Sequence, residues 1–464
     1  MSILKILLTG IAVLMVTVPF AAALFSQQPA GLPATTPDPQ IAAVMRNVSP
    51  ARIQQTIEKL VSFITRQTLS SDMPASSGKG ANAAAAWIQS EFERYSKECG
   101  GCLEVKTDEF TQEPGPRIPK PTKITNVYAV LRGTDPANAG RIVLVTGHYD
   151  SRNSDTNNAT DPAPGANDDG SGTAVSLECA RVLSKQHFPA TIIFLTVAGE
   201  EQGLYGSAHF AKMAKAQGWN IEAVLNNDIV GGDRTPGDAM QDPHVVRVFS
   251  EGIPSTADEK QLKTIRGLGG ENDGPSRQLA RYIASVSKEY FPLATFQPLV
   301  VFRRDRYLRG GDHFSFNEQG YAAVRFTEFR ENHQHQNVRA ENGIEYGDLP
   351  KFVDYDYTAN VARLNSATLA SLASAPAPPA NVRLLTKELQ NDSTIVWEPS
   401  PGGLATGYEV LWRDTAAPDW QHAQAVGNVT RATLPVSKDN VVFAVCAFDA
   451  RGNRGLAVVP MPER

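Results

Sequence analysis

Residues 190–203 read ATIIFLTVAGEEQG, and this stretch decides the fold. Its first part, Ala190 to Val197, is an almost continuous apolar run of strand length, which predicts a buried central strand. Two adjacent carboxylates, Glu200 and Glu201, follow directly at its carboxyl end. That end of a strand is where open α/β sheets bind their ligands.

Strands and helices alternate on both sides of this stretch, from about Val44 to Ala373. We expect helices over 82–98 and 171–184, and strands over 126–132, 141–146 and 223–229. Such alternation is typical of α/β proteins. The sequence therefore predicts a three-layer α/β/α sandwich around a mixed, mostly parallel sheet, formed by residues 45–373.

The composition changes at the Pro-rich run of residues 374–380, which predicts a semi-rigid spacer. Short strands are expected beyond it, over 394–397, 407–412 and 441–448, so residues 381–464 are predicted to form a small all-β sandwich. Trp397, Tyr408 and the run YEVLW resemble a fibronectin type III domain. Because this part has no catalytic cluster, we expect an adhesion or spacing role for it.

Residues 1–23 have the three parts of a secretory signal: a positive charge, an apolar run and the small residues Ala21 to Ala23. We expect cleavage after Ala23 and a secreted or periplasmic protein. An uncleaved membrane anchor is the alternative, because the run has roughly the ~20 residues of a spanning helix. Residues 24–44, rich in Pro, Ala, Gln and Thr, are expected to be a linker.

The overall composition excludes several classes of protein. Apolar residues make up 42% and charged residues 20% of the 464, enough for a large core, so a disordered or collagen-like chain is excluded. The formal net charge is -5 and no domain has a basic excess, so we expect no nucleic-acid partner.

Four cysteines are present. Outside the cytoplasm Cys99 and Cys102 are expected to close a small disulfide loop, with a redox-active pair as the alternative. Cys179 and Cys446 are expected to be isolated buried thiols.

Acidic and histidine side chains gather after several predicted strands. His148 and Asp150 lie on the same side of an extended segment, where a carboxylate can orient a metal-ligating histidine. Asp168 follows in a Gly-rich turn before a helix. Glu200 and Glu201 must be exposed or neutralised by a cation, since burying both unpaired is costly. Asp228 ends a further strand.

In this order, the segments resemble the co-catalytic dizinc exopeptidase family over about residues 125–370. The family includes bacterial secreted aminopeptidases, glutamate carboxypeptidase-like enzymes and glutaminyl cyclases. The resemblance implies two zinc ions per chain and a peptide substrate. It implies that His148 binds one zinc and that Asp150 orients it, while Asp168 bridges both metals.

The same resemblance assigns the remaining roles. Glu201 is implied as a ligand of the second zinc and Asp228 as a ligand of the first. Glu200 is implied as the general base, which takes a proton from water and returns it to the leaving amine.

The last zinc ligand departs from the family pattern, in which a late histidine is followed by Asp four residues on. Arg339 stands four residues after His335. We expect His335 to be the ligand, with His333 and His313 as alternatives.

The resemblance predicts a zinc-dependent exopeptidase that removes N-terminal residues. A C-terminal-cleaving enzyme is an alternative, if Arg303, Arg304, Arg306 and Arg309 bind a substrate carboxylate rather than forming salt bridges. A glutaminyl cyclase and a non-catalytic binding protein are further alternatives, although binding alone would not need Glu200. Tyr307 is a candidate donor to the oxyanion.

Overall fold

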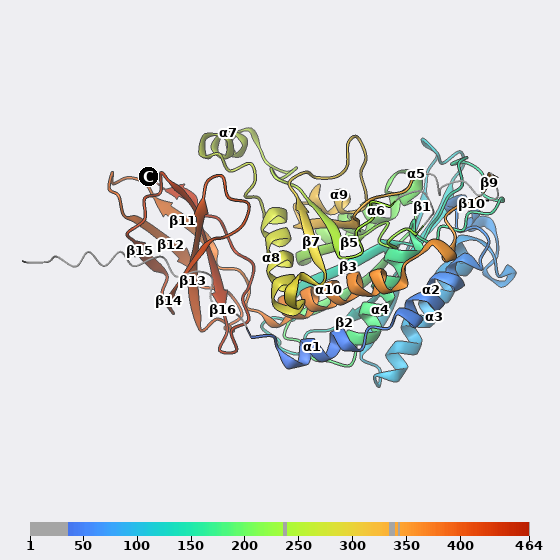
Figure 1. The fold of residues 1–464 in the computed structure, drawn as a ribbon, viewed down its shortest axis with the longest axis horizontal. Coiled ribbons are helices and arrows are strands. Elements are labelled where there is room, and N and C mark those ends of the chain that lie inside the picture. The colour runs from blue at the N-terminus through green and yellow to red at the C-terminus, as the bar shows by residue number, and fades with distance from the viewer. Residues whose placement is uncertain (1–35, 235–238, 334–338, 342–343, 464) are drawn as a thin grey trace, which may run out of the picture.

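A computed structural model describes residues 36–234, 239–333, 339–341 and 344–463 (Figure 1). The predicted signal peptide, residues 1–23, lies outside these ranges. Within them, no helix is both long enough and apolar enough to cross a bilayer.

An eight-stranded mixed sheet forms the centre of the larger domain, with the strand order β1-β2-β4-β3-β5-β8-β6-β7. The strands are β1 (Leu103–Gln112), β2 (Thr122–Leu131), β3 (Arg141–His148), β4 (Thr191–Val197), β5 (Asn220–Asn227), β6 (Val245–Ser250), β7 (Gln297–Val301) and β8 (Ala323–Glu328). The inner strands β4, β3, β5 and β8 are mutually parallel, whereas β2 and β6 pair antiparallel to them. The predicted mixed, mostly parallel sheet is confirmed.

Helices cover both faces of this sheet (Figure 1). One face packs against α1 (Pro39–Arg46), α2 (Pro50–Val61), α3 (Gly80–Glu98), α4 (Gly170–Leu183), α8 (Pro275–Tyr290) and α10 (Tyr355–Ser374). The other packs against α6 (Tyr205–Ala216) and α9 (His313–Asn317). Along β4, Ile192 and Phe194 belong to the first core, whereas Ile193 and Leu195 belong to the second. This alternation confirms the three-layer sandwich.

Shorter elements connect these layers. They are α5 (Glu200–Gly203), α7 (Glu259–Leu268), the hairpin of β9 (Arg339–Glu341) and β10 (Ile344–Tyr346), and the 3-10 turns Thr68–Asp72, Ala75–Ser77, Pro292–Ala294 and Pro350–Phe352. Cys99 and Cys102, at the end of α3, form the predicted disulfide. Cys179 and Cys446 are buried free thiols, also as predicted.

Residues 380–463 form a separate β domain of two packed sheets. One sheet has the order β15-β12-β11-β17 and the other β14-β13-β16. The strands are β11 (Ala380–Leu385), β12 (Ser393–Glu398), β13 (Gly407–Asp414), β14 (His422–Gly427), β15 (Arg431–Leu434), β16 (Val441–Phe448) and β17 (Met461–Glu463). Trp397, Tyr408 and Trp412 lie in the core between the sheets. The all-β domain is confirmed, and its likeness to fibronectin type III remains a prediction.

Two predicted linkers are corrected by the structure. The linker over 24–44 is wrong at its C-terminal end, because α1 begins at Pro39, Asp38 caps it, and Ile41 and Val44 are buried. A proline in the first turn starts a helix rather than preventing one. The Pro-rich run over 374–380 does connect the two domains, from the end of α10 to the start of β11, but it is packed rather than free, because Ala375 and Ala377 are only 0% and 2% exposed.

The β domain is docked against the larger domain through buried charges. Asp273 pairs with Arg281 of α8 at 3.3 Å and with Arg413 of β13 at 2.6 Å. Arg281 also donates to the carbonyl of Pro418 at 2.7 Å. The β domain is therefore held by specific contacts, and the short segment before it lies within the interface.

Candidate active site

Three neighbouring parallel strands end at one edge of the sheet. His148 is the last residue of β3, Glu200 is the third residue after β4, and Asp228 directly follows β5. Carboxyl ends of parallel strands lie together, which is where α/β sheets bind ligands. Each of these residues has one possible metal-ligand atom within 4.8 Å of those of the other two. The structure therefore brings together side chains that are up to 80 residues apart in sequence.

His148 presents its two ring nitrogens to different acids. Nδ1 lies 3.1 Å from the Asp150 carbonyl and 3.4 Å from its Oδ1. Nε2 lies 3.3 Å from Oδ1 of Asp168 and 3.8 Å from Oδ1 of Asp228. Within the described part of the chain this buried Nε2 makes no hydrogen bond. A buried, unsatisfied imidazole nitrogen facing carboxylates fits a metal ligand.

Asp150 connects His148 to the segment after β4. Its Oδ2 accepts a hydrogen bond from Thr68 Oγ1 at 3.0 Å. The backbone N–H groups of Glu200 and Glu201 donate to the same carboxylate at 3.4 and 3.3 Å. Asp150 therefore holds both the imidazole and the turn that carries the two glutamates.

The adjacent acids Asp168 and Asp169 face different partners. Asp168 faces His148. Asp169 caps α4 by accepting a hydrogen bond from the Gly172 N–H at 2.8 Å. Its other carboxylate oxygen accepts from the backbone N–H of His148 at 3.0 Å. Gly172 is required here, since a Cβ would lie 2.1 Å from the Asn227 carbonyl. The Gly-rich motif thus lets the start of α4 lie against the ends of β3 and β5.

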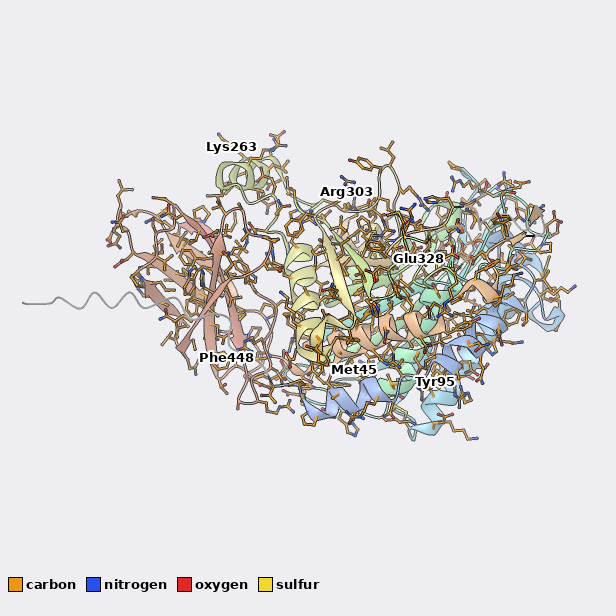
Figure 2. The ribbon with its side chains drawn as sticks, in the orientation of Figure 1. Met45, Tyr95, Lys263, Arg303, Glu328 and Phe448 are labelled. Carbon is orange, nitrogen blue, oxygen red and sulfur yellow. A yellow bond between two sulfur atoms is a disulfide. The ribbon has the colours of Figure 1, made fainter. Side chains whose placement is uncertain are left out.

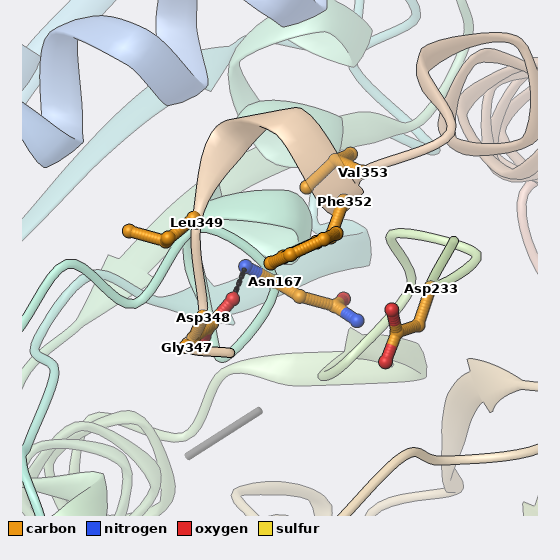
Figure 3. A pocket seen from close by; sticks show the side chains of 7 residues that line it. All are labelled: Asn167, Asp233, Gly347, Asp348, Leu349, Phe352 and Val353. Atoms are coloured by element: carbon orange, nitrogen blue, oxygen red, sulfur yellow. Dashed lines mark hydrogen bonds between the residues drawn. The ribbon is translucent and has the colours of Figure 1, made fainter. Parts of the chain in front are cut away.

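A distant acid fixes the backbone that carries Asp168. The Asp348 carboxylate accepts from the N–H of Asn167 at 2.6 Å and from that of Asp168 at 2.8 Å. Figure 3 shows the hydrogen bond between Asn167 and Asp348 beside a small pocket, whose other lining residues are Asp233, Gly347, Leu349, Phe352 and Val353. The fully buried Arg66 supports the same loop by donating to the carbonyls of Pro164 and Gly165. Sequence reasoning missed both residues.

Glu200 and Glu201 contact different partners, although they are adjacent in the sequence. Glu200 belongs to the group of donors with His148 and Asp228. The Glu201 carboxylate pairs with Nε of Arg152 at 2.5 Å. Burial raises the pKa of Glu200 well above its ordinary value, and the charge of Asp228 adds to this. Burial and repulsion from Asp168 raise the pKa of Glu201 to about 8, although Arg152 opposes the rise.

The buried acids of the site favour binding of a cation. Burial, together with Asp228, raises the pKa of the nearby Asp312 to about 7. Burial alone would lower the pKa of His148, but the carboxylates of Asp150 and Asp168 outweigh it and hold this pKa well above its usual range. A bound cation would relieve the repulsion among these buried acids. Nitrogen and oxygen donors without thiolates suit zinc.

Asp228 has a further partner that the sequence reasoning missed. Nη2 of Arg325, in β8, lies 2.9 Å from Oδ1 of Asp228. Residues 322–326 read AAVRF, so Arg325 is a charged residue in an otherwise apolar run that predicts a buried strand. Because a charge is rarely buried without a partner, this was the signal by which Arg325 could have been found.

Comparison with known proteins places this site in a family. The model of "Peptidase family M28" matches residues 126–355. A "Probable zinc metalloprotease" of Pyrenophora teres f. teres is 46% identical over 433 residues, covering 92% of this chain and 88% of that protein. The chain belongs to peptidase family M28. It is accordingly a zinc metallopeptidase, and the family predicted from the motifs is confirmed.

Other similar proteins agree with this M28 assignment. A "Probable zinc metalloprotease" of Pyricularia oryzae is 46% identical over 438 residues, which are 92% of this chain and 86% of that protein. The crystal structure of the Legionella pneumophila LapA aminopeptidase matches with a TM-score of 0.51 and 23% identity, over 72% of this chain and 75% of that chain. The structural match shows that the two share a fold.

The last ligand expected for this M28 chain, His335, lies outside the described residues. Of the two alternatives, His333 is exposed. His313 is buried, and its Nε2 donates to the Arg304 carbonyl at 2.9 Å. Burial lowers the pKa of His313 to about 4. Neither belongs to the donor group around His148 within the described chain.

Three of the four arginines after β7 form salt bridges, the ordinary interpretation of such a cluster. Arg306 and Arg309 each lie 2.8 Å from Oε2 of Glu331. Arg304 lies 3.6 Å from Glu251. Arg303, on the exposed loop after β7 (Figure 2), stacks 3.9 Å from the ring of Tyr307.

Tyr307 is not placed for the role proposed from sequence. Its side chain is 78% exposed, and its hydroxyl accepts a hydrogen bond from Arg303 Nη2 at 3.1 Å. An oxyanion donor would need to be directed at the reacting carbonyl. The structure gives no support for Tyr307 as that donor.

Proposed function

We propose that this M28 zinc metallopeptidase is a dizinc aminopeptidase that removes N-terminal residues from peptides. The observation that carries the proposal is the convergence on His148, whose Nε2 is unsatisfied, of carboxylates that follow β4 and β5 and of Asp168 before α4. In this proposal one zinc is held by His148, Asp168 and Asp228, and the other by Asp168, Glu201 and His335. Asp168 is the shared ligand.

The chemistry then divides between the metals and the chain's own groups. When bound, zinc would act as a Lewis acid, which lowers the pKa of water and polarises the peptide carbonyl. Glu200 takes a proton from the attacking water through its carboxylate and later gives it to the leaving amine. Asp150 keeps the imidazole of His148 in the orientation and tautomer that leave Nε2 free for the metal.

Two features favour cleavage from the N-terminus. The acidic surroundings of Glu200 and Asp312 favour the ammonium group of a free N-terminus over a C-terminal carboxylate. Three of the four candidates for binding such a carboxylate, Arg304, Arg306 and Arg309, already pair with acids of the chain, and the fourth, Arg303, stacks on the exposed ring of Tyr307. The LapA aminopeptidase, which shares the fold, is consistent with this choice.

A substrate profile tests the proposal. We expect the chain to release the first residue from peptides and aminoacyl amides with a free N-terminus, and to lose this activity with a chelator. N-acetylated forms of the same peptides should react at least about 100-fold more slowly, roughly 3 kcal/mol in transition-state binding. Release of C-terminal residues from the acetylated peptides would contradict the proposal.

The last ligand can be assigned by comparing histidine variants. We expect His335→Ala to reduce the zinc content from two ions to about one, because Glu201 and Asp168 alone hold the second ion weakly. His333→Ala and His313→Gln should keep both ions. Zinc content measured after desalting checks this, and full occupancy in His335→Ala would exclude His335.

We also propose that the protein works outside the cytoplasm. The disulfide between Cys99 and Cys102 supports this, because such bonds persist mainly in oxidising compartments. The signal-like segment of residues 1–23 supports it independently.

A further inference from the structure

We propose that Arg325 is a positioning residue that fixes the carboxylate of Asp228 for zinc and joins it to the turn over residues 305–310. This inference rests on the proposed function, in which Asp228 is a zinc ligand. Arg325 lies on β8, next to the strand that Asp228 follows, with Asn226 of β5 as its register partner.

The guanidinium of Arg325 is completely buried. It contacts two segments, Asp228 and the turn over residues 305–310. Its Nη2 lies 2.9 Å from Oδ1 of Asp228 and 3.3 Å from the Asp228 carbonyl. Its Nη1 donates to the Gly310 carbonyl at 2.9 Å and lies 3.3 Å from Oδ2 of Asp305. The planar fork of an arginine therefore holds the side chain and the backbone of Asp228 against the turn.

The turn is itself rigidly held. Asp305 is buried, and its Oδ1 accepts from both the backbone N–H and Nε of Arg306, at 2.6 and 2.9 Å. Nε2 of His313 lies 3.5 Å from the other oxygen of Asp305. Arg325 thus connects Asp228 to Asp305 and Gly310, the two ends of a turn whose middle residues, Tyr307 and Leu308, are exposed.

The chain passes close to the Arg325–Asp228 contact at Gly311. A Cβ on Gly311 would lie 3.0 Å from Nη1 of Arg325 and 3.2 Å from Oδ2 of Asp228. A side chain at this position would therefore force these two groups to shift by a few tenths of an ångström.

The buried charge of Arg325 indicates a role in orienting the Asp228 carboxylate as a metal ligand. Both terminal nitrogens of this buried guanidinium are paired, whereas its Nε makes no hydrogen bond within the described chain. Burying such a charge is costly, and pairs of this kind are weak evidence for stability alone. Partners of ligating carboxylates orient them, and their loss typically lowers metal affinity about 10–100-fold. Lysine cannot replace the fork, because its single ammonium group cannot hold both segments.

The test compares Arg325→Lys with Arg141→Lys. Arg141 is a matched control, since it is a buried strand arginine that pairs through two nitrogens with Glu222 at 2.8 Å, at the opposite end of β3. Zinc affinity is measured by competition with a chromogenic chelator, and thermal unfolding by circular dichroism of the zinc-free chains. We expect Arg325→Lys to weaken zinc binding about 10–100-fold. Arg141→Lys should leave zinc affinity within about twofold of wild type while lowering the unfolding temperature.

A second variant, Gly311→Ala, crowds the contact between the Arg325 guanidinium and the Asp228 carboxylate without removing either group. We expect it to weaken zinc binding roughly tenfold, so the inference stays testable if Arg325→Lys does not fold. Unchanged zinc affinity in the folded variants would overturn the positioning role. Wild-type chain that binds no zinc would instead contradict the proposed function, so the two failures are distinguishable.

Discussion

Glu200→Gln is expected to lower kcat by about 10²–10⁴-fold while the chain keeps its zinc. The substitution preserves size but removes the group that accepts and returns the proton. Glu200 lies with His148 and Asp228 at the sheet edge, where the attacking water would bind in the proposed site. Steady-state kinetics on an aminoacyl amide, together with zinc analysis of the same sample, measures both quantities.

A surface glutamate provides the control for this prediction. Glu318→Gln, at an exposed position with a side chain 60% accessible, should leave kcat within about twofold of wild type. A kcat for Glu200→Gln close to that of the control would remove Glu200 from the mechanism. Loss of zinc from Glu200→Gln would instead make it a ligand.

Asp168→Asn is expected to reduce the zinc content from two ions to one or fewer and kcat/KM by about 10³-fold or more. Asp168 is the carboxylate that both metals share in the proposed site, and a metal ion contributes several kcal/mol to transition-state stabilisation. An amide keeps the shape of the side chain but loses the charge that attracts a second cation. Zinc analysis and kinetics on one preparation check the prediction.

An exposed acid of the same loop controls for general effects of charge. Asp161, which pairs with Asn158 on the surface, should tolerate replacement by Asn without loss of zinc or activity. Two bound ions in Asp168→Asn would show that this carboxylate is not the shared ligand.

Much of the larger domain could be predicted because its signals are local. The apolar run of β4 and the motifs at the ends of β3 and β5 each lie within a few residues. Parallel strand ends necessarily share one edge of a sheet, so His148, Glu200 and Asp228 could be expected to meet. The different contacts of Asp168 and Asp169, in contrast, depend on how α4 packs against β5.

The supporting residues could not be predicted, because their partners are remote in sequence. Asp348 holds the Asp168 backbone from 180 residues away, and Arg325 reaches Asp228 across 97. Nothing near either residue in the sequence indicates its partner. The packing of the Pro-rich run of residues 374–380 could not be predicted either. Its composition predicts a stiff connection but not the surface against which it packs.

The number of zinc ions bound by the wild-type chain tests the central claim most directly. The chain is equilibrated with excess zinc, desalted, and analysed by mass spectrometry for zinc and by amino-acid analysis for protein. Two ions per chain are predicted, since the proposed ligands form two sets that share Asp168. One ion or none would contradict a dizinc site.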